Sequence, residues 1–274
     1  MLRIFGLLLE IVVGAFWLPS IADSEEFEII RTHTIEPFEE DIDLAAVPIA
    51  NIHFHILSET KVAGQTDQFP GMKIFWAKGH SGREDGGFVW QLRWEPVTEP
   101  LAPEVEFQVH TDDRMRIQSI EISDVTAPFV NASQITEQQK DEMEVQLKRS
   151  IGWIFIPLPQ GAVGMNDVLI EKERVMEILL MGPPAEAEIV ENTLESRVAG
   201  ISRIDGQTLL AVQHSGELVY KSGAQTIEIA IDGFSYIDVE LGVVVEFKIS
   251  QSMQPLSEPD NAFVKINTFG RLPN

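Results

Sequence analysis

Apolar and polar residues alternate most regularly in the last third of the chain. Apolar side chains occupy every second position there, at Val243, Val245, Phe247 and Ile249. From position 246 onward the alternate positions are polar, with Glu246, Lys248 and Ser250. Successive side chains of a β-strand point to opposite faces, so this pattern predicts a strand with one apolar and one polar face. The same period recurs at Leu210, Val212, Leu218 and Tyr220, and again at Ile227, Ile229 and Ile231.

Short glycine-containing turns separate these alternating segments. Asp205-Gly206 and Ser222-Gly223 are dipeptides typical of tight hairpins, because glycine accepts the positive φ that such turns need. Asp232-Gly233 predicts either a third hairpin or a glycine bulge within one long strand, and the bulge is favoured because 238–242 already predicts the next turn. The stretch Arg197–Ser250 therefore predicts an antiparallel meander with one apolar and one solvated face.

The first half of the chain predicts a second antiparallel set. Its strands are expected at Phe27–Thr34, at Val47–Leu57, in a hairpin of Met72–Ala77 with Phe88–Glu95, and at 105–109 and 115–122. The last of these changes the parity of its apolar residues once, as a bulged strand does.

One amphipathic helix is expected between the two sets. Thr136 and Gln139 have the spacing of a capping box, and Met143, Leu147 and Ile151 form one apolar stripe. The segment Val168–Met181 is less clear, because its residue types favour helix. It precedes Gly182-Pro183-Pro184 and the apolar run at 189–204, and we interpret it as one strand of a long hairpin.

These elements predict a mainly β (α+β) fold, with antiparallel meanders forming a curved sheet or unclosed barrel and one packed amphipathic helix. The expected regions are a signal peptide at 1–22, an acidic lead-in at 23–45, an N-terminal β region at 46–130, a helix and Pro-containing loop at 131–160, a C-terminal meander at 161–255 and a tail at 256–274.

The N-terminus predicts export. Arg3 precedes an apolar run that ends at Leu18, and Ser20 and Ala22 are small residues at the positions a signal peptidase recognises. We therefore expect cleavage after Ala22 and a periplasmic or extracellular protein. An uncleaved membrane anchor is the alternative, and Glu10 within the apolar run disfavours both.

Charge and cysteine content exclude several functions. The formal net charge is −23, and the segment Asp23–Asp43 alone holds nine acids and one arginine. A surface this acidic repels phosphate backbones, so a nucleic-acid partner is not expected. The chain has no cysteine, which excludes thiol catalysis and cysteine-based metal centres.

The segment Leu158–Met253 resembles a pattern found in exported bacterial β-rich proteins. The residues that carry it are Pro157-Leu158-Pro159, Val163-Gly164-Met165-Asn166-Asp167 and the turn from Gly233 to Gly242. The meander with a single helix also resembles the unclosed barrel of the periplasmic lipoprotein-carrier superfamily. That resemblance implies a curved sheet around an apolar cavity covered by helices, and it assigns no ligand residue.

Two groups of residues are candidates for a site. Phe88, Trp90 and Trp94 share one face of a predicted strand with Leu92, and Trp76 lies in the partner strand. Such a face can line an apolar cavity, although aromatic residues more often form core. His53 and His55 share one face of a predicted strand, and Ile52, Phe54 and Ile56 share the other face. Two histidines on one face could bind a metal, and the third ligand would be His33, His110 or a carboxylate of a neighbouring strand. The alternative is that both histidines face solvent.

The favoured function is non-catalytic binding of an apolar small molecule or of an envelope partner. A metal-assisted hydrolase centred on His53 and His55 and a structural envelope protein are the alternatives. No cofactor is expected, and no membrane span is expected after signal cleavage. The sequence does not indicate an oligomeric state.

Overall fold

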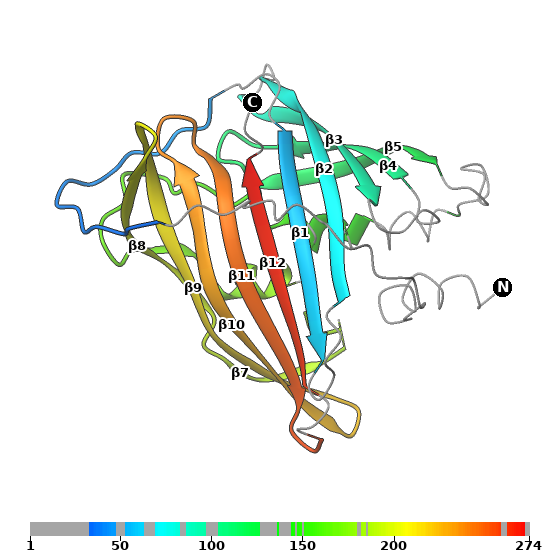
Figure 1. Cartoon of the computed structure of the whole chain (residues 1–274). Helices are drawn as coiled ribbons and strands as arrows, with labels where there is room; N and C mark the ends of the chain where they lie inside the picture. The colour runs from blue at the N-terminus through cyan, green and yellow to red at the C-terminus, as the bar shows by residue number, and fades with distance from the viewer. Residues whose placement is uncertain are drawn as a thin grey trace, which may run out of the picture.

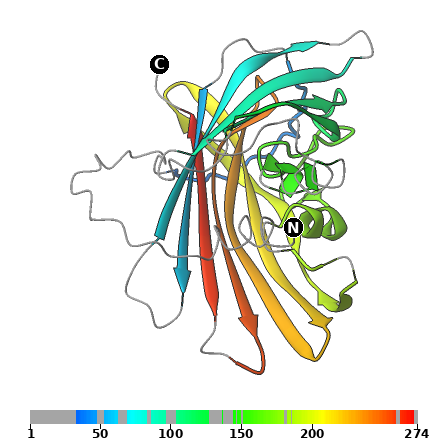
Figure 2. The ribbon, with the colours of Figure 1, turned by 90° about the vertical axis from the view of Figure 1, so that its right-hand side faces the viewer.

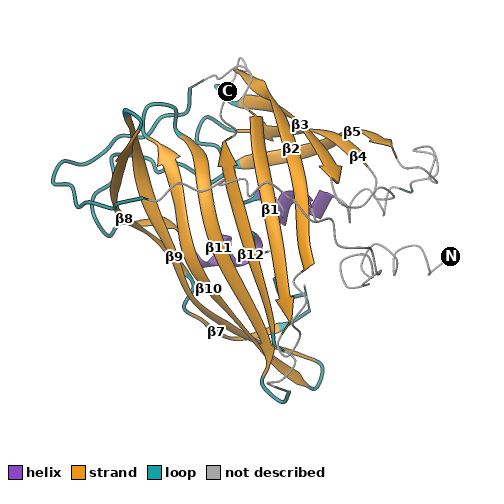
Figure 3. Ribbon diagram, viewed as in Figure 1, coloured by secondary structure: helices purple, strands orange, loops and turns teal. Residues whose placement is uncertain are grey.

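A computed structural model of the chain describes residues 33–47, 53–62, 69–82, 86–96, 104–126, 136, 144–145, 147–149, 151–179, 182–184, 186–258 and 262–271. These residues form a single curved antiparallel sheet with short helices on one side (Figures 1 and 3). The predicted fold class, a mainly β protein with an unclosed curved sheet, is confirmed. No described helix is both long enough and apolar enough to traverse a bilayer.

The sheet contains twelve strands. They are β1 (His53–Val62), β2 (Phe69–Gly82), β3 (Phe88–Pro96), β4 (Glu104–Thr111), β5 (Ile117–Thr126), β6 (Val168–Ile170), β7 (Glu188–Asn192), β8 (Glu195–Ile204), β9 (Gln207–Ser222), β10 (Gln225–Asp238), β11 (Val243–Pro255) and β12 (Phe263–Arg271). The order across the sheet is β5-β4-β3-β2-β1-β12-β11-β10-β9-β8-β6, and β7 pairs with β9.

The C-terminal meander follows the predicted turns. Asp205 and Gly206 have φ values of 51° and 80° and connect β8 to β9 as a two-residue hairpin. β10 passes through Asp232-Gly233 without turning, which confirms one long strand. The register shift between β10 and β11 lies at Tyr236/Ile237 and not at Gly233. The predicted bulge at the glycine is therefore displaced by three residues, because a glycine can relieve close backbone contact without adding a residue to the strand.

The N-terminal set also forms, with longer strands than the pattern indicates. β2 and β3 make the expected hairpin, and β5 has two register shifts against β4. β1 extends to Val62 and β2 begins at Phe69, beyond the predicted strand ends at Leu57 and Met72. The strand expected at Phe27–Thr34 falls largely outside the described residues, and its last two residues are not in a strand.

The predicted helix before Ile151 is present where the structure describes it, whereas the predicted strand at Val168–Met181 is mostly not a strand. Residues 144–145, 147–149 and 151 are helical, and Leu147 and Ile151 are buried as the apolar stripe predicts. Among the described residues of the second segment, 168–179, the strand is limited to Val168–Ile170, and α3 (Lys172–Glu177) follows it. The strand interpretation is wrong for that part, because good helix formers there also place Val175, Ile178 and Leu179 on one buried face.

The segment 256–274 contains a strand that the pattern does not reveal. β12 lies in the middle of the sheet and pairs with β1 on one side and β11 on the other. Its sequence places polar residues such as Lys265 at the positions that alternate with Val264 and Ile266. Polar residues therefore fall in the register of Phe263 and Phe269, and the apolar alternation is lost.

Residues 33–47 form a segment that we call the strap. Figure 1 shows it lying over the β8 side of the face opposite the helices and passing round the edge at β8. Glu36 pairs with Ile201 in both directions, at 2.8 and 2.9 Å, and Ile42 pairs with Val163. Leu209 and Leu210 point to opposite faces of β9, and both are fully buried. The expected solvated face is therefore wrong for this end of the sheet.

Two glycines allow the strap to approach the sheet. Gly200 has φ +152° and Gly242 has φ +64°, and a Cβ at these positions would lie 2.5 Å from the Glu36 carbonyl oxygen and 2.4 Å from that of Ala45. A larger residue would therefore displace the strap backbone.

Candidate functional site

The two faces of the sheet have different coverings. The inner face is the one that the helical layer covers, as Figure 2 shows, and Trp153 from that layer packs against the His214 ring at 4.8 Å between centroids. The outer face is the one that the strap crosses, where the His33 ring stacks on Tyr236 at 3.7 Å. The strand register assigns the paired residues of β9, β10 and β11 to one of these faces.

The inner face is apolar at both ends with a polar band between. We call the end of the sheet near the turns that carry Asp205 and Gly242 the upper part, and the opposite end the lower part. Phe247 and Phe269 stack in the upper part, with ring centroids 5.1 Å apart. The lower part ends at the β9–β10 hairpin, and its inner-face residues in register are Leu218, Tyr220, Ile227, Ile229, Met253 and Phe263. Ile227, Met253 and Phe263 are only partly buried. The lower inner face is thus an apolar surface that the rest of the described chain covers incompletely.

The polar band contains a buried histidine between two serines. His214 Nδ1 lies 2.7 Å from Ser196 Oγ and its Nε2 lies 2.7 Å from Ser235 Oγ, and all three side chains are fully buried. Burial lowers the pKa of His214 to about 3, so the imidazole is neutral at physiological pH. A neutral imidazole donates from one nitrogen and accepts at the other, which two hydroxyls can satisfy. This geometry suits a structural cluster, since no described carboxylate orients the ring as in a catalytic triad.

The polar band also contains Gln251. Gln251 follows Ile249 on the inner face, is fully buried, and pairs in register with Ile231 and Lys265. Neither its amide nitrogen nor its amide oxygen has a hydrogen-bond partner among the described residues. The indole nitrogen of Trp153 is in the same situation. Buried polar groups without partners are rare in proteins, which marks this band as unusual.

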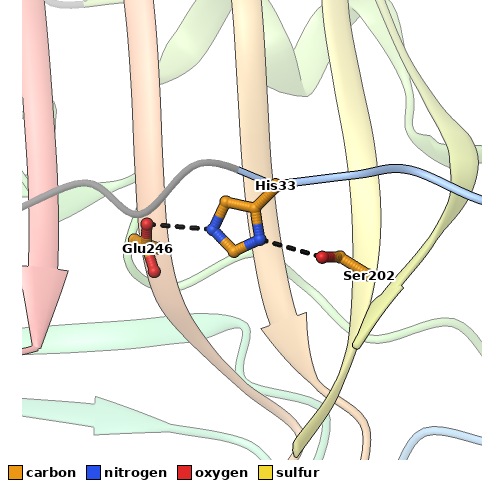
Figure 4. A network of polar contacts seen from close by, with 3 residues as sticks. All are labelled: His33, Ser202 and Glu246. Carbon is orange, nitrogen blue, oxygen red and sulfur yellow. Dashed lines mark hydrogen bonds and ion pairs between the residues drawn. The ribbon is translucent and has the colours of Figure 1, made fainter. Parts of the chain in front are cut away.

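A second buried histidine lies on the outer face, as Figure 4 shows. His33 Nε2 is 2.9 Å from Glu246 Oε1, and its Nδ1 is 3.0 Å from Ser202 Oγ. The His33 and Glu246 side chains are 2% and 3% exposed. Burial, together with the Glu246 carboxylate, raises the pKa of Tyr236 to about 12. The cluster fastens the start of the strap to β8, β10 and β11.

The structure does not bring together the two candidate metal-site histidines whose side chains it describes, His33 and His110. His33 is held on the outer face, and His110 lies on β4 with its ring 3.6 Å from Glu121. His53 and His55 occupy β1 positions opposite Trp76 and Ile74, and their side chains lie outside the described part. Among the described residues no group of three histidines, aspartates or glutamates has the geometry to hold a metal.

The structure describes the side chains of two of the four aromatic candidates, Phe88 and Trp90. Phe88 and Trp90 are 5% and 1% exposed, and the Trp90 ring meets Phe155 edge to face at 5.1 Å. This is the packing expected of core residues. Trp76 and Trp94 face Arg93 and Phe75 across the β2–β3 ladder, and their side chains lie outside the described residues. The role of all four as ligand contacts stays a prediction.

Sequence reasoning missed both buried histidine clusters. His214 has the parity of Leu210 and Val212, so the alternation alone could have placed it in the core. His33 offered no such signal, because it lies in an acidic segment without periodicity and meets its partners across more than 160 residues.

The comparisons with known proteins return little. No protein-family model matches the chain, and no curated protein matches it. A solved structure of a LolA superfamily protein from Nitrosomonas europaea is 10% identical with a TM-score of 0.21, over 84% of this chain and 89% of that one. A putative outer membrane lipoprotein-sorting protein domain from Vibrio parahaemolyticus is 8% identical with a TM-score of 0.17, over 80% and 83%. At these scores neither match assigns a family or a function to the chain.

Proposed function

We propose that this protein is an exported, non-catalytic binding protein that holds an apolar ligand against the inner face of its sheet. The observation that carries the proposal is the lower inner face. Met253 and Phe263 pair with each other there, and Ile227 lies on the same face opposite Pro255. All three stay partly exposed, whereas inner-face residues of the upper part such as Phe247 and Phe269 are buried.

The apolar surface of the lower inner face also extends onto β7, which pairs with the lower end of β9. Ile189 on β7 pairs with Tyr220 and is 40% exposed. Apolar residues concentrated on a concave surface are the usual lining of small-molecule sites. A chain-like apolar molecule lying along β10, β11 and β12 would remove this surface from water, which is the main driving force for such binding.

A titration with a fluorescent fatty acid tests the proposal, after the purified protein has been stripped of bound lipid. Phe263→Ser removes an apolar side chain from the lower inner face, and Val264→Ser is the matched control because the next residue of β12 points to the outer face. We expect the wild type and Val264→Ser to bind the probe and Phe263→Ser to bind it at least several-fold more weakly. Absence of binding to the wild type would leave a structural envelope role.

Export is tested separately. We expect the N-terminal sequence of exported material to begin at or near Asp23, as the small residues Ser20 and Ala22 indicate. Recovery of an intact Met1 from a membrane fraction would contradict the proposed cleavage.

A further inference from the structure

The edge of the sheet next to β9 is covered in its upper part. β6 pairs with the first residues of β8, and Val198 of β8 makes two backbone hydrogen bonds of 2.9 Å with the segment 166–167. Further along β8, Ile201 exchanges two backbone hydrogen bonds with Glu36 of the strap. An unpaired strand edge is a template for association with other chains, so these contacts protect the upper edge.

The lower part of the same edge is formed by β7, which pairs with the lower end of β9 (Figure 1). No strand of the described chain pairs with the other side of β7. Apart from the ladder to β9, the described residues also give no backbone hydrogen bond to 188–192. The part of the chain that the structure describes thus leaves one side of this five-residue strand open for pairing.

β7 also keeps apolar side chains exposed. Ile189 and Val190 are 40% and 53% exposed, and Val190 has no partner residue on β9 because the register shifts there. Polar residues at both positions would protect the edge better from association. Two exposed β-branched residues on an open strand edge are instead favourable for the addition of an extended peptide, in which backbone hydrogen bonds give affinity and alternate side chains give specificity.

The charges of β7 and its surroundings indicate which kind of segment fits. The stretch 186–191 contains three exposed glutamates and no basic residue. A second copy of the chain fits poorly, because antiparallel pairing centred on the two apolar residues places each Glu188 opposite a Glu191. Like charges directly opposite each other destabilise a strand pair, whereas opposite charges stabilise it. Lysine or arginine at alternate positions of the added strand complements these carboxylates.

We propose that β7 is a docking edge for an extended basic segment of a partner protein, which adds to the sheet as a further strand. The apolar residues of the segment pack beside Ile189 and Val190, and its basic residues pair with the glutamates of 186–191. This interaction is independent of the apolar ligand proposed for the inner face.

A labelled peptide, acetyl-Lys-Val-Lys-Ile-Lys-Val-Lys-amide, titrated with the full-length protein at physiological ionic strength, tests the proposal by fluorescence anisotropy. Its control is a peptoid with the same side chains, which has the same charge and no backbone N–H. The wild type should bind the peptide at least about tenfold more tightly than the peptoid, because the backbone hydrogen bonds provide much of the affinity in this mode.

Two double variants separate the local charge of β7 from the net charge of the protein. Glu186→Lys with Glu191→Lys should weaken peptide binding about tenfold or more, because like charges then meet at the edge. Glu40→Lys with Glu240→Lys is the matched control, since it makes the same change in net charge at exposed residues of the strap and of the β10–β11 turn. The control should stay within about twofold of the wild type, because salt screens charges at that distance. Melting curves of both variants verify folding.

Hydrogen exchange measured by mass spectrometry locates the bound peptide. Peptide binding should slow the exchange of the amides of 188–192, because their open side becomes paired. It should leave β5 unchanged, which lies at the other end of the strand order.

Every other outcome overturns the proposal. Equal affinity for the peptide and the peptoid, or equal losses in the two double variants, would indicate general attraction to an acidic protein. Protection of β5 in place of β7 would assign the docking edge to the opposite end of the sheet. Wild-type dimers that the peptide dissociates, detected by sedimentation, would assign β7 to a second copy of the chain. Absence of peptide binding to the wild type would show that β7 accepts no strand of this kind.

Discussion

The upper and lower parts of the sheet are built from the same strands and are covered differently. In the upper part the helical layer packs on the inner face and the strap on the outer face, and neighbouring residues such as Leu209 and Leu210 are both fully buried. In the lower part the outer face is without the strap, and inner-face residues such as Met253 and Phe263 remain partly exposed. The difference indicates that the upper part contributes most of the tight packing, whereas the lower inner face keeps apolar surface exposed.

The largest expected effect comes from truncating one inner-face residue in each part. Phe247→Ala in the upper part should destabilise the protein by about 3–5 kcal/mol, because it leaves a cavity beside the stacked Phe269 ring. Met253→Ala in the lower part should cost less than about 2 kcal/mol, because its side chain is only partly buried. Urea unfolding of both variants measures the difference, and equal costs would erase the distinction between the two parts.

The next effect is a pH dependence from His214 in the polar band. Burial lowers its folded-state pKa to about 3, against 6.5 in the unfolded chain. Below pH 6.5 the unfolded chain therefore binds a proton that the folded protein does not, so stability is lost as the pH falls toward 3. The slope should be about 1.4 kcal/mol per pH unit from this group.

His214→Asn isolates this slope from the many surface carboxylates. The free energy of unfolding of the variant should depend less steeply on pH between about 6 and 4 than that of the wild type. Parallel pH profiles would show that His214 is accessible to protons in the folded state and that the band is more open than its burial indicates.

A smaller effect is expected from detaching the strap. His33→Ala leaves the Glu246 carboxylate buried without the imidazole, at a cost of roughly 2 kcal/mol for a lost hydrogen bond to a charged group. The strap backbone should then become more sensitive to limited proteolysis, while the fluorescent fatty acid still binds the lower part. Loss of probe binding in this variant would show that the two parts are coupled.

The smallest expected change in stability comes from replacing either of two glycines that have the same backbone conformation. Gly242 under the strap and Gly223 in the lower hairpin have φ values of +64° and +60°, yet a Cβ meets the Ala45 carbonyl oxygen at 2.4 Å only in the first. Gly223→Ala should cost about 1 kcal/mol for the left-handed conformation alone. Gly242→Ala should cost measurably more, and the excess measures the contact of the strap. Identical melting temperatures would indicate that the strap moves aside without cost.

The sequence predicted the parts of the fold whose patterns are local. The alternation from 243 to 249 and the Asp205-Gly206 turn specify strands and hairpins through nearest neighbours, and both are confirmed. The strap contacts and β12 could not be predicted, because they depend on partners far along the chain and on polar residues in sheet positions. The inner-face position of Gln251 follows from the alternation after Val243, but its lack of partners emerges only in three dimensions.

The position of β12 has a consequence for how the protein is made. β12 joins the two halves of the sheet, because β1 pairs with it on one side and β11 on the other. Until a nascent chain has released residues 263–271, β1 and β11 each present an unpaired edge, and such edges associate readily with other chains. The two meanders can therefore form early and separately, but the sheet is completed only by its last strand. A chain of this design benefits from a holding factor until translation has delivered β12.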